Sequence, residues 1–346
     1  MNPFIERDRI TNPQRFAGRW RELSIIFDRL ETHRPVLITG SPAIGKSSLL
    51  THIVQSAAIA MEQLDLRAYY VDLAVLTSEV DFYELVVKAL QNRGNTAAAL
   101  EVALLTVDGP VLLCLDNADA AITAGWGELL LERLVRMVRS RRARRVGDAA
   151  QQGNEGVSLM LVAAVTGPAP QLSEPFAALN LGAFAPAEVR LVAEAYLDSA
   201  DVAFSPEDLH NLADLSARHP AYLQRAAFHL FQAKIQPGYD WRAAYRQEVR
   251  ERPIPGAALP PGVFESERGA SESILADDDQ AEVTSAVRPE ALQSQGMGGF
   301  LIVMLTLAMA LIVFQASGNW WLAGGTLVAG LAVVVTIERR RTKPEL

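Results

Sequence analysis

The feature that most constrains the fold is the stretch VLITGSPAIGKSSLL, residues 36–50. An apolar strand pattern runs into Gly40, four residues intervene, and Gly45, Lys46 and Ser47 then open a helical pattern. This is the spacing of a phosphate-binding loop, in which glycines allow successive backbone N–H groups to point at one anion. The start of a helix adds a favourable dipole for negative charge. The stretch therefore predicts a nucleotide site at the end of a strand.

The polar side chains of this loop have expected roles. The Lys46 ammonium is predicted to reach the β- and γ-phosphates of ATP, and the Ser47 hydroxyl is predicted to hold Mg²⁺. We therefore expect ATP-Mg²⁺ as the ligand. The predicted nucleotide contacts along the loop are Gly40, Ser41, Pro42, Ala43, Ile44, Gly45, Lys46, Ser47 and Ser48.

The alternation of strand and helix patterns predicts the fold class. Apolar runs separated by helical patterns fill residues 36–184, as in a parallel sheet covered by helices on both faces. A helix is expected in the lead-in, 1–35, and from 185 to 252 only helical patterns occur, one of them starting at Ser205-Pro206. We expect an α/β fold: a three-layer P-loop core with a parallel sheet, then a small all-helical lid. The expected strands are 35–40, 67–74, 110–116, 157–167 and 179–184.

A second chemical signal is the run PVLLCLD, which ends in Asp116. A carboxylate at the end of a buried strand, about seventy residues after Lys46, suits a sheet in which one other strand separates the two. Asp116 is therefore expected to hold Mg²⁺ through water. Cys114 in the same run is the only cysteine, so no intramolecular disulfide forms, and we interpret it as strand packing.

Two further segments resemble a known family. NPF followed by FAGRWREL, residues 16–23, looks like the FxGRxxEL lead-in of AAA-related and STAND signal-transduction ATPases. LSARHPAYLQRAAFHLF, residues 215–231, resembles the GHPYxLQ lid motif of the same proteins. The resemblance covers about residues 2–235 and implies a P-loop ATPase of the additional-strand (ASCE) class.

The resemblance also implies positions for the nucleotide base. Gly18 and Arg19 would lie against the adenine, while His219 and Pro220 would close on the base and ribose. Arg218 stands where glycine is usual in the family, which puts the local backbone turn in doubt.

The residues expected to act in hydrolysis depart from the pattern of that class. An acidic residue that polarises the attacking water commonly follows the strand-ending aspartate, but here the position is Asn117, which cannot accept a proton. Asp119 could substitute, or could merely cap the next helix. Thr166 could sense the γ-phosphate, or could be an ordinary strand-end residue. With Lys46 and Asp116, Asp119 completes the catalytic candidates, and ATP binding is better supported than fast hydrolysis.

The C-terminal part reads differently from the rest. Residues 253–296 are rich in proline, glycine, serine and acid, which predicts a disordered linker. Within 297–337, two uncharged apolar runs flank the turn QASGN, which predicts a transmembrane hairpin rather than a buried hairpin of a soluble core. Three arginines in the tail, 338–346, predict a cytoplasmic end. The N-terminus lacks the apolar segment of a signal peptide, so we expect both termini and the ATPase domain to be cytoplasmic, on the inner membrane.

Charge gives one more candidate surface. The net charge of −8 does not favour a nucleic-acid binder, but seven arginines lie within 133–145. They fit a solvated helix end, a contact with lipid headgroups, an arginine reaching a neighbouring subunit's γ-phosphate, or nucleic-acid backbone binding. The five histidines show no metal-ligand spacing.

These patterns together predict a membrane-anchored ATP-binding protein, a slow ATPase that acts as a nucleotide-dependent signalling or assembly switch. The expected partners are ATP-Mg²⁺, membrane lipids through 297–337, further copies of the chain and a protein that the sequence does not specify. No nucleic-acid partner is expected. The alternatives are a membrane scaffold that binds ATP without hydrolysis and, less favoured, a DNA-handling AAA-type ATPase.

Overall fold

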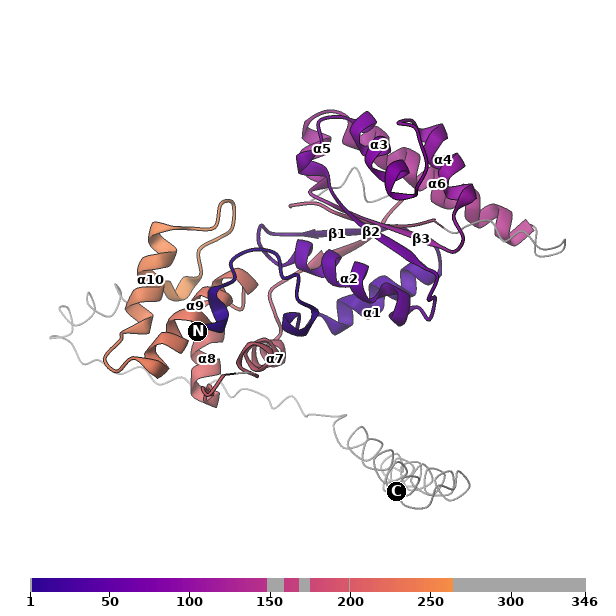
Figure 1. Cartoon of the computed structure of the whole chain (residues 1–346). Helices are drawn as coiled ribbons and strands as arrows, with labels where there is room; N and C mark the ends of the chain where they lie inside the picture. Colours follow the sequence, from indigo (N-terminus) through magenta and orange to yellow (C-terminus); the bar gives the residue numbers. More distant parts are fainter. Residues whose placement is uncertain (1, 148–158, 168–174, 199, 264–346) are drawn as a thin grey trace, which may run out of the picture. The chain divides into compact units, whose positions relative to one another are not determined.

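The computed structural model describes residues 2–147, 159–167, 175–198 and 200–263 (Figure 1). The side chains of 140–147 are not part of this description. The described chain contains an α/β part and a helical unit, which the N-terminal segment connects.

A five-stranded sheet with the order β2-β3-β4-β1-β5 forms the centre of the α/β part. Every pair of neighbouring strands is parallel, so all carboxyl ends meet at one edge. β4 lies between β1 and β3, which confirms the predicted strand between the loop and Asp116. The strands are β1 (Val36–Gly40), β2 (Arg67–Asp72), β3 (Val111–Asp116), β4 (Leu159–Ala164) and β5 (Ala177–Leu181).

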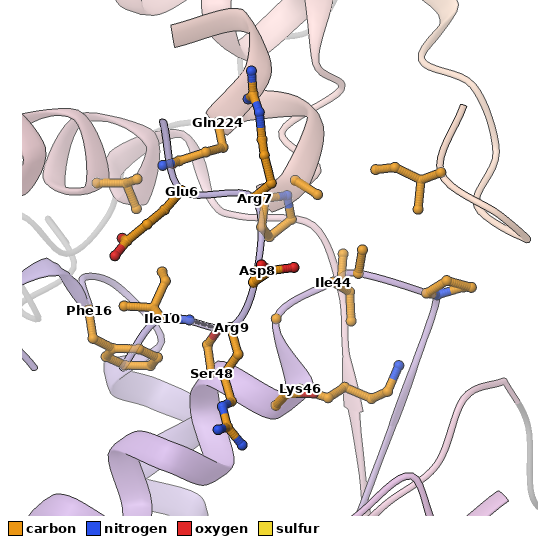
Figure 2. Close-up of a pocket in the computed structure, with 18 of the residues that line it drawn as sticks. Glu6, Arg7, Asp8, Arg9, Ile10, Phe16, Ile44, Lys46, Ser48 and Gln224 are labelled. Atoms are coloured by element: carbon orange, nitrogen blue, oxygen red, sulfur yellow. Dashed lines mark hydrogen bonds between the residues drawn. The ribbon is translucent and has the colours of Figure 1, made fainter. Parts of the chain in front are cut away.

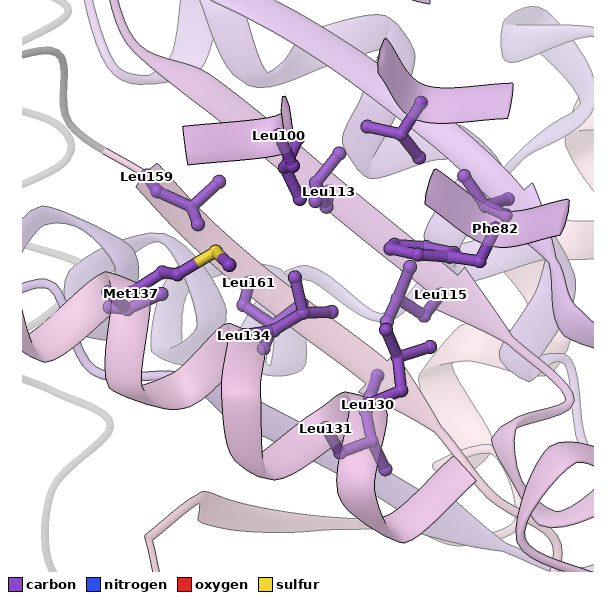
Figure 3. Packing of buried hydrophobic residues seen from close by; sticks show 14 of the residues in the cluster. Phe82, Leu100, Leu113, Leu115, Leu130, Leu131, Leu134, Met137, Leu159 and Leu161 are labelled. Atoms are coloured by element: carbon purple, nitrogen blue, oxygen red, sulfur yellow. The ribbon is translucent and has the colours of Figure 1, made fainter. Parts of the chain in front are cut away.

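Helices cover both faces of this sheet, as predicted (Figure 1). On one face, leucines of β3 and β4 pack against α3, α4, α5 and α6, and Figure 3 shows Leu134 and Met137 of α6 in this cluster. On the other face, alternate residues of β3, among them Cys114, pack with α1 and α2. Cys114 is fully buried, which confirms its packing role. These helices are α1 (Trp20–Glu31), α2 (Lys46–Ala60), α3 (Glu79–Ala89), α4 (Ala97–Thr106), α5 (Ala118–Thr123) and α6 (Gly127–Gly147).

The helical unit has a core of its own, in which Tyr222 and Tyr245 are fully buried. Ser205 caps α8 through its side chain and Pro206 is the first helical residue, as the sequence predicts. The four helices are α7 (Pro186–Leu197), α8 (Pro206–Leu215), α9 (Pro220–Ile235) and α10 (Trp241–Glu251).

Residues 253–263 differ from the predicted disordered linker. Ile254 and Val263 are buried in the core of the helical unit, and the chain ends there in a short 3-10 helix, η6 (Pro261–Val263). The Ile254 N–H donates to the Tyr222 hydroxyl at 3.3 Å. Apolar burial, together with the hydrogen bonds that Arg246 and Arg250 donate to the carbonyl oxygens of Gly262 and Val263, therefore holds this proline-rich segment on the helices. The rest of the predicted linker lies outside the described residues.

Residues 2–19, called the N-terminal strap below, run from the helical unit to the α/β part. Phe4 is fully buried among the helices, with its ring 5.2 Å from that of Tyr196. Further along, the Ile10 N–H donates to the Ser48 hydroxyl at 3.0 Å, so the strap also binds α2. Two short 3-10 helices lie within it, η1 (Pro3–Ile5) and η2 (Pro13–Arg15).

The predicted transmembrane hairpin, 297–337, and the tail, 338–346, lie outside the described residues. Within the described ranges, no helix combines the length and the apolar character that crossing a membrane requires.

Candidate nucleotide-binding site

A cavity of about 470 Å³ lies where the phosphate-binding loop, the strap and the helical unit meet (Figure 2). Its walls include loop residues 42–48, Asn117 and Thr166 at strand ends, and strap residues 6–10. Figure 2 shows Lys46 and Ser48 on one side, with Gln224 of α9 across from them. Ligands bind open α/β sheets at the carboxyl ends of the strands, and this cavity lies there.

The loop has the backbone that the sequence predicts. Gly45 has a φ of 98°, in the left-handed region that favours glycine. A Cβ on Gly40 would lie 2.7 Å from the Leu181 carbonyl oxygen, so this position has no room for a side chain. Ser47 is the first-turn neighbour of Lys46 on α2 and lines the cavity.

The Lys46 ammonium lies against the loop itself. Its Nζ donates to the carbonyl oxygens of Gly40 at 3.1 Å and Ser41 at 2.9 Å. Burial lowers the pKa of Lys46, and the negative charges of Asp119 and then Asp116 oppose that shift. The two carboxylates predicted from sequence are thus electrostatic partners of the loop lysine.

Asp116 is buried and held at both carboxylate oxygens. Its Oδ2 accepts the Tyr70 hydroxyl at 2.6 Å, and its Oδ1 accepts the Asn117 N–H at 3.0 Å. Burial, with a further contribution from the bond to Asp116, raises the pKa of Tyr70, so the phenol remains a donor. Arg9 of the strap lies over the Tyr70 ring, 4.2 Å from its centroid.

Asp119 bonds across the sheet edge. Its Oδ1 accepts the backbone N–H of Thr166, which follows β4, at 3.2 Å. At the start of α5 the cap position is Asn117, without a side-chain cap bond. The Asp119 side chain therefore bonds to the residue that follows the end of β4 and does not act as the cap of α5. Thr166 lines the cavity, as a γ-phosphate sensor would.

Arg19 lies in the cavity wall, but its guanidinium is engaged with the protein. It donates to the carbonyl oxygens of Ile44 at 3.3 Å and Gly182 at 2.7 Å, and pairs with Glu22 at 3.0 Å. Gly18 precedes it with a φ of 78°. The segment predicted to lie against adenine is therefore at the cavity, with Arg19 joining the loop to the end of β5.

Pro220 is the first residue of α9 and lines the cavity, and His219 is the cap residue before it. The His219 Nε2 lies 3.1 Å from the Pro42 carbonyl oxygen, which can only accept, so this nitrogen carries the proton. Burial lowers the pKa of His219 and favours the neutral ring. Arg218 has a φ of 59°, so the turn that usually uses glycine forms with arginine here.

Part of the arginine cluster is described. Arg133 pairs with Glu79 at 2.7 Å and Arg136 pairs with Glu132 at 2.9 Å, both within the α/β part. The side chains of the cluster beyond Arg139 lie outside the described residues.

Several residues at the site were not identified from the sequence. Tyr70 and Asp72 both belong to β2, and Asp72 is the register partner of Asp116. The sequence signal for these two residues is the run RAYYVD, an expected strand that ends in an aspartate. The strand that ends in Asp116 has the same pattern. Ile254 and Pro255, which also line the cavity, fell in the predicted linker.

Comparison with known proteins agrees with this geometry. Residues 29–161 match the family model described as an AAA domain. Over this range, which holds the phosphate-binding loop and strands β1 to β3, the chain is similar to an AAA domain. The match does not distinguish a STAND subtype. No curated protein sequence matches the chain.

The solved structures that match the chain include the following three. The RuvB Holliday junction branch migration motor of Thermotoga maritima is 16% identical, covers 78% of this chain and 80% of its own, and has a TM-score of 0.44. The ORC1 protein of Aeropyrum pernix in complex with DNA is 13% identical, with 96% and 86% covered and a TM-score of 0.44. A Walker-type ATPase of Pyrococcus abyssi is 10% identical, with 78% and 81% covered and a TM-score of 0.47.

Proposed function

We propose that this chain binds ATP-Mg²⁺ in the cavity between the α/β part and the helical unit, and hydrolyses it slowly. The observation that carries the proposal is a cavity of about 470 Å³ whose wall is a phosphate-binding loop with its lysine. The donor set fits Mg²⁺, because the Ser47 hydroxyl and the Asp116 carboxylate are hard oxygen ligands. When bound, the ion would neutralise charge on the β- and γ-phosphates.

Asp119 is the proposed proton acceptor in hydrolysis. The oxygen of a water molecule forms a bond to the γ-phosphorus, and the bond from phosphorus to the β–γ bridging oxygen breaks. One proton of the water passes to the Asp119 carboxylate and then to solvent, and ADP and inorganic phosphate leave. Lys46 stabilises the charge that develops on the phosphates.

The nucleotide also connects the two parts of the protein in this proposal. The cavity wall combines loop residues with Pro220, Ala221 and Gln224 of α9. A ligand that contacts both would favour the arrangement in which they are close, since a ligand shifts the population toward the state it binds best. By the resemblance to STAND ATPases, that state would self-associate and act as a signalling switch.

A membrane anchor completes the proposal. Its support is the pair of uncharged apolar runs within 297–337, followed by the arginines of the tail. The hairpin would contact lipids of the cytoplasmic (inner) membrane, with the ATPase domain and both termini in the cytoplasm. Nucleotide-dependent association would then gather copies of the hairpin, which anchors the chain.

The replacement Lys46→Ala tests the nucleotide site. We expect it to weaken ATP-Mg²⁺ binding by about a hundredfold or more, because it removes the charge that pairs with the phosphates. Full-length protein in mild detergent would be titrated with ATP, assayed for phosphate release, and sized by light scattering with and without nucleotide. Lys88→Ala, at an exposed position of α3, is the matched control.

The outcomes separate the candidate functions. Turnover and ATP-dependent assembly that both disappear in Lys46→Ala support the switch. Tight ATP binding without turnover or assembly supports the scaffold instead. Equal ATP affinity in the wild type and Lys46→Ala would contradict the site.

Nucleic acid is not part of the proposed function. Although RuvB and ORC1 act on or bind DNA by their descriptions, a fold likeness at 16% and 13% identity does not carry a ligand to this chain. We expect no binding of a labelled DNA duplex in fluorescence anisotropy at low salt. Binding that weakens steeply as salt rises would contradict this expectation and favour the DNA-handling alternative.

A further inference from the structure

The ends of β2 and β3 bring together Asp72 and Asn117, two side chains that the proposed function does not yet use. Asp72 and Asp116 are register partners in these parallel strands, and Asn117 follows directly. The Asn117 Nδ2 donates to the Asp72 Oδ1 at 2.9 Å. Asn117 lines the cavity, and Asp72, on the neighbouring strand, contacts the Asn117 side chain.

This contact fixes which way the Asn117 amide points. An ionised carboxylate can only accept hydrogen bonds, so the NH₂ group of Asn117 must face Asp72. The carbonyl oxygen of the amide is then the atom left to act as an acceptor on the other side. The backbone is held too, because the Asn117 N–H donates to Asp116 at 3.0 Å.

The backbone of Asn117 explains why asparagine suits this position. Its φ of 52° is left-handed, a conformation that asparagine adopts more readily than most residues. The backbone of Asn117 is therefore held by Asp116, and its side-chain amide is held by Asp72. Such an arrangement is pre-organised rather than selected by the ligand.

We propose that Asp72 is a positioning residue for ATP hydrolysis, acting through Asn117. Asp72 holds the amide so that the Asn117 Oδ1 accepts a hydrogen bond from the attacking water and aligns it with the γ-phosphorus. The water's proton goes to Asp119, since an amide cannot take it. This inference rests on the proposed hydrolysis and accounts for an asparagine at a position where an acid is common.

Asp72 also has a structural role that a test must separate. Its Oδ1 accepts the Ala74 N–H at 3.0 Å and so caps the 3-10 helix η3 (Leu73–Val75). Serine is a cap residue as effective as aspartate, but its side chain is shorter. Asp72→Ser therefore keeps a cap acceptor and withdraws the partner of Asn117.

The experiment compares single and paired variants of the full-length chain. We expect Asp72→Ser to lower kcat about tenfold, with the KM for ATP and the dissociation constant of ATP-Mg²⁺ within about twofold of wild type. Asn117→Asp alone would place two carboxylates in contact and also lower kcat. The double variant Asp72→Asn/Asn117→Asp restores a donor–acceptor pair with reversed polarity and is expected to recover kcat.

Asp240→Ser is the matched control, because Asp240 caps α10 through the Ala243 N–H, and neither residue lines the cavity. It should leave kcat unchanged. Unchanged kcat in Asp72→Ser, a loss of kcat that merely follows a lower Tm, or a double variant as slow as Asn117→Asp would each overturn the inference while wild-type turnover stands. A wild type that binds ATP without turnover would overturn the proposed hydrolysis and the inference together.

Discussion

Replacement of Phe4 with alanine is expected to lower the free energy of unfolding of the protein by about 3–5 kcal/mol. Phe4 is fully buried, although it comes from the N-terminal strap rather than from the helices that surround it. Its ring is stacked with those of Tyr196 and Phe204, at centroid distances of 5.2 and 5.7 Å. Truncation would leave a cavity between aromatic rings that cannot close on a methyl group. Urea unfolding followed by circular dichroism measures the change.

The same replacement should also weaken ATP binding, because the strap continues from Phe4 into the wall of the nucleotide cavity. Residues 6–10, which follow Phe4 in the chain, line that cavity. Asn2, which precedes Phe4, donates from its side-chain amide to the Phe228 carbonyl oxygen at 2.9 Å. If the strap is docked for only a tenth of the time, the apparent affinity falls about tenfold. Isothermal titration with ATP-Mg²⁺ measures this second effect.

Two variants serve as controls for Phe4. Phe4→Leu keeps most of the apolar volume and should cost roughly 1–2 kcal/mol. Ile5 is 60% exposed, so Ile5→Ala should change the free energy of unfolding by about 0.5 kcal/mol or less. A Phe4→Ala protein as stable as Ile5→Ala would show that the strap does not hold the helical unit.

The central part of the fold could be predicted because its signals are local and periodic. The strands β1, β3 and β4 are almost continuous apolar runs, and polar loops and amphipathic helices separate them along the chain. The phosphate-binding loop and Asp116 follow from the same logic, since the end of a parallel strand fixes where a side chain emerges. Sequence spacing alone therefore placed Lys46 and Asp116 on one site.

The contacts that complete the site carry no such signal. Phe4 is a single apolar residue in a polar segment, and its neighbour Asn2 reaches Phe228, 226 positions away. The Asp72–Asn117 bond depends on two strands adopting one register, which neither strand encodes alone. Composition predicts residues 253–263 to be linker, whereas burial of Ile254, Pro260 and Val263 places them on the helical unit. Tertiary packing outweighs composition in such segments.

Replacement of Arg19 with alanine is the second change with a large expected effect, about 3–5 kcal/mol of the free energy of unfolding. The side chain of Arg19 is 4% exposed, and its guanidinium lies 4.5 Å from the centroid of the Phe184 ring. Removing it leaves Glu22 without its cation and leaves the carbonyl oxygens of Ile44 and Gly182 without a donor. The Ile44 carbonyl oxygen is the costly loss, because it is buried and water cannot replace the missing donor.

Arg19→Lys tests whether charge or geometry matters at this position. A lysine keeps the positive charge but lacks the planar group that serves two carbonyl oxygens and covers Phe184, so we expect a loss of roughly 1–2 kcal/mol. Arg21, two positions further on in α1, is exposed, and Arg21→Ala should change the free energy of unfolding by about 0.5 kcal/mol or less.

The Arg19 variants also test whether Arg19 couples the position of the helical unit to the phosphate-binding loop. The Arg19 N–H donates to Glu188 of α7 at 2.5 Å, while its guanidinium binds the carbonyl oxygen of Ile44 in the loop. One residue thus contacts both walls of the cavity. Arg19→Ala should therefore weaken ATP-Mg²⁺ binding about tenfold even at temperatures where the variant is fully folded. A folded Arg19→Ala protein with wild-type ATP affinity would mean that Arg19 only stabilises the fold, and that the two walls are aligned by the strap and His219 without it.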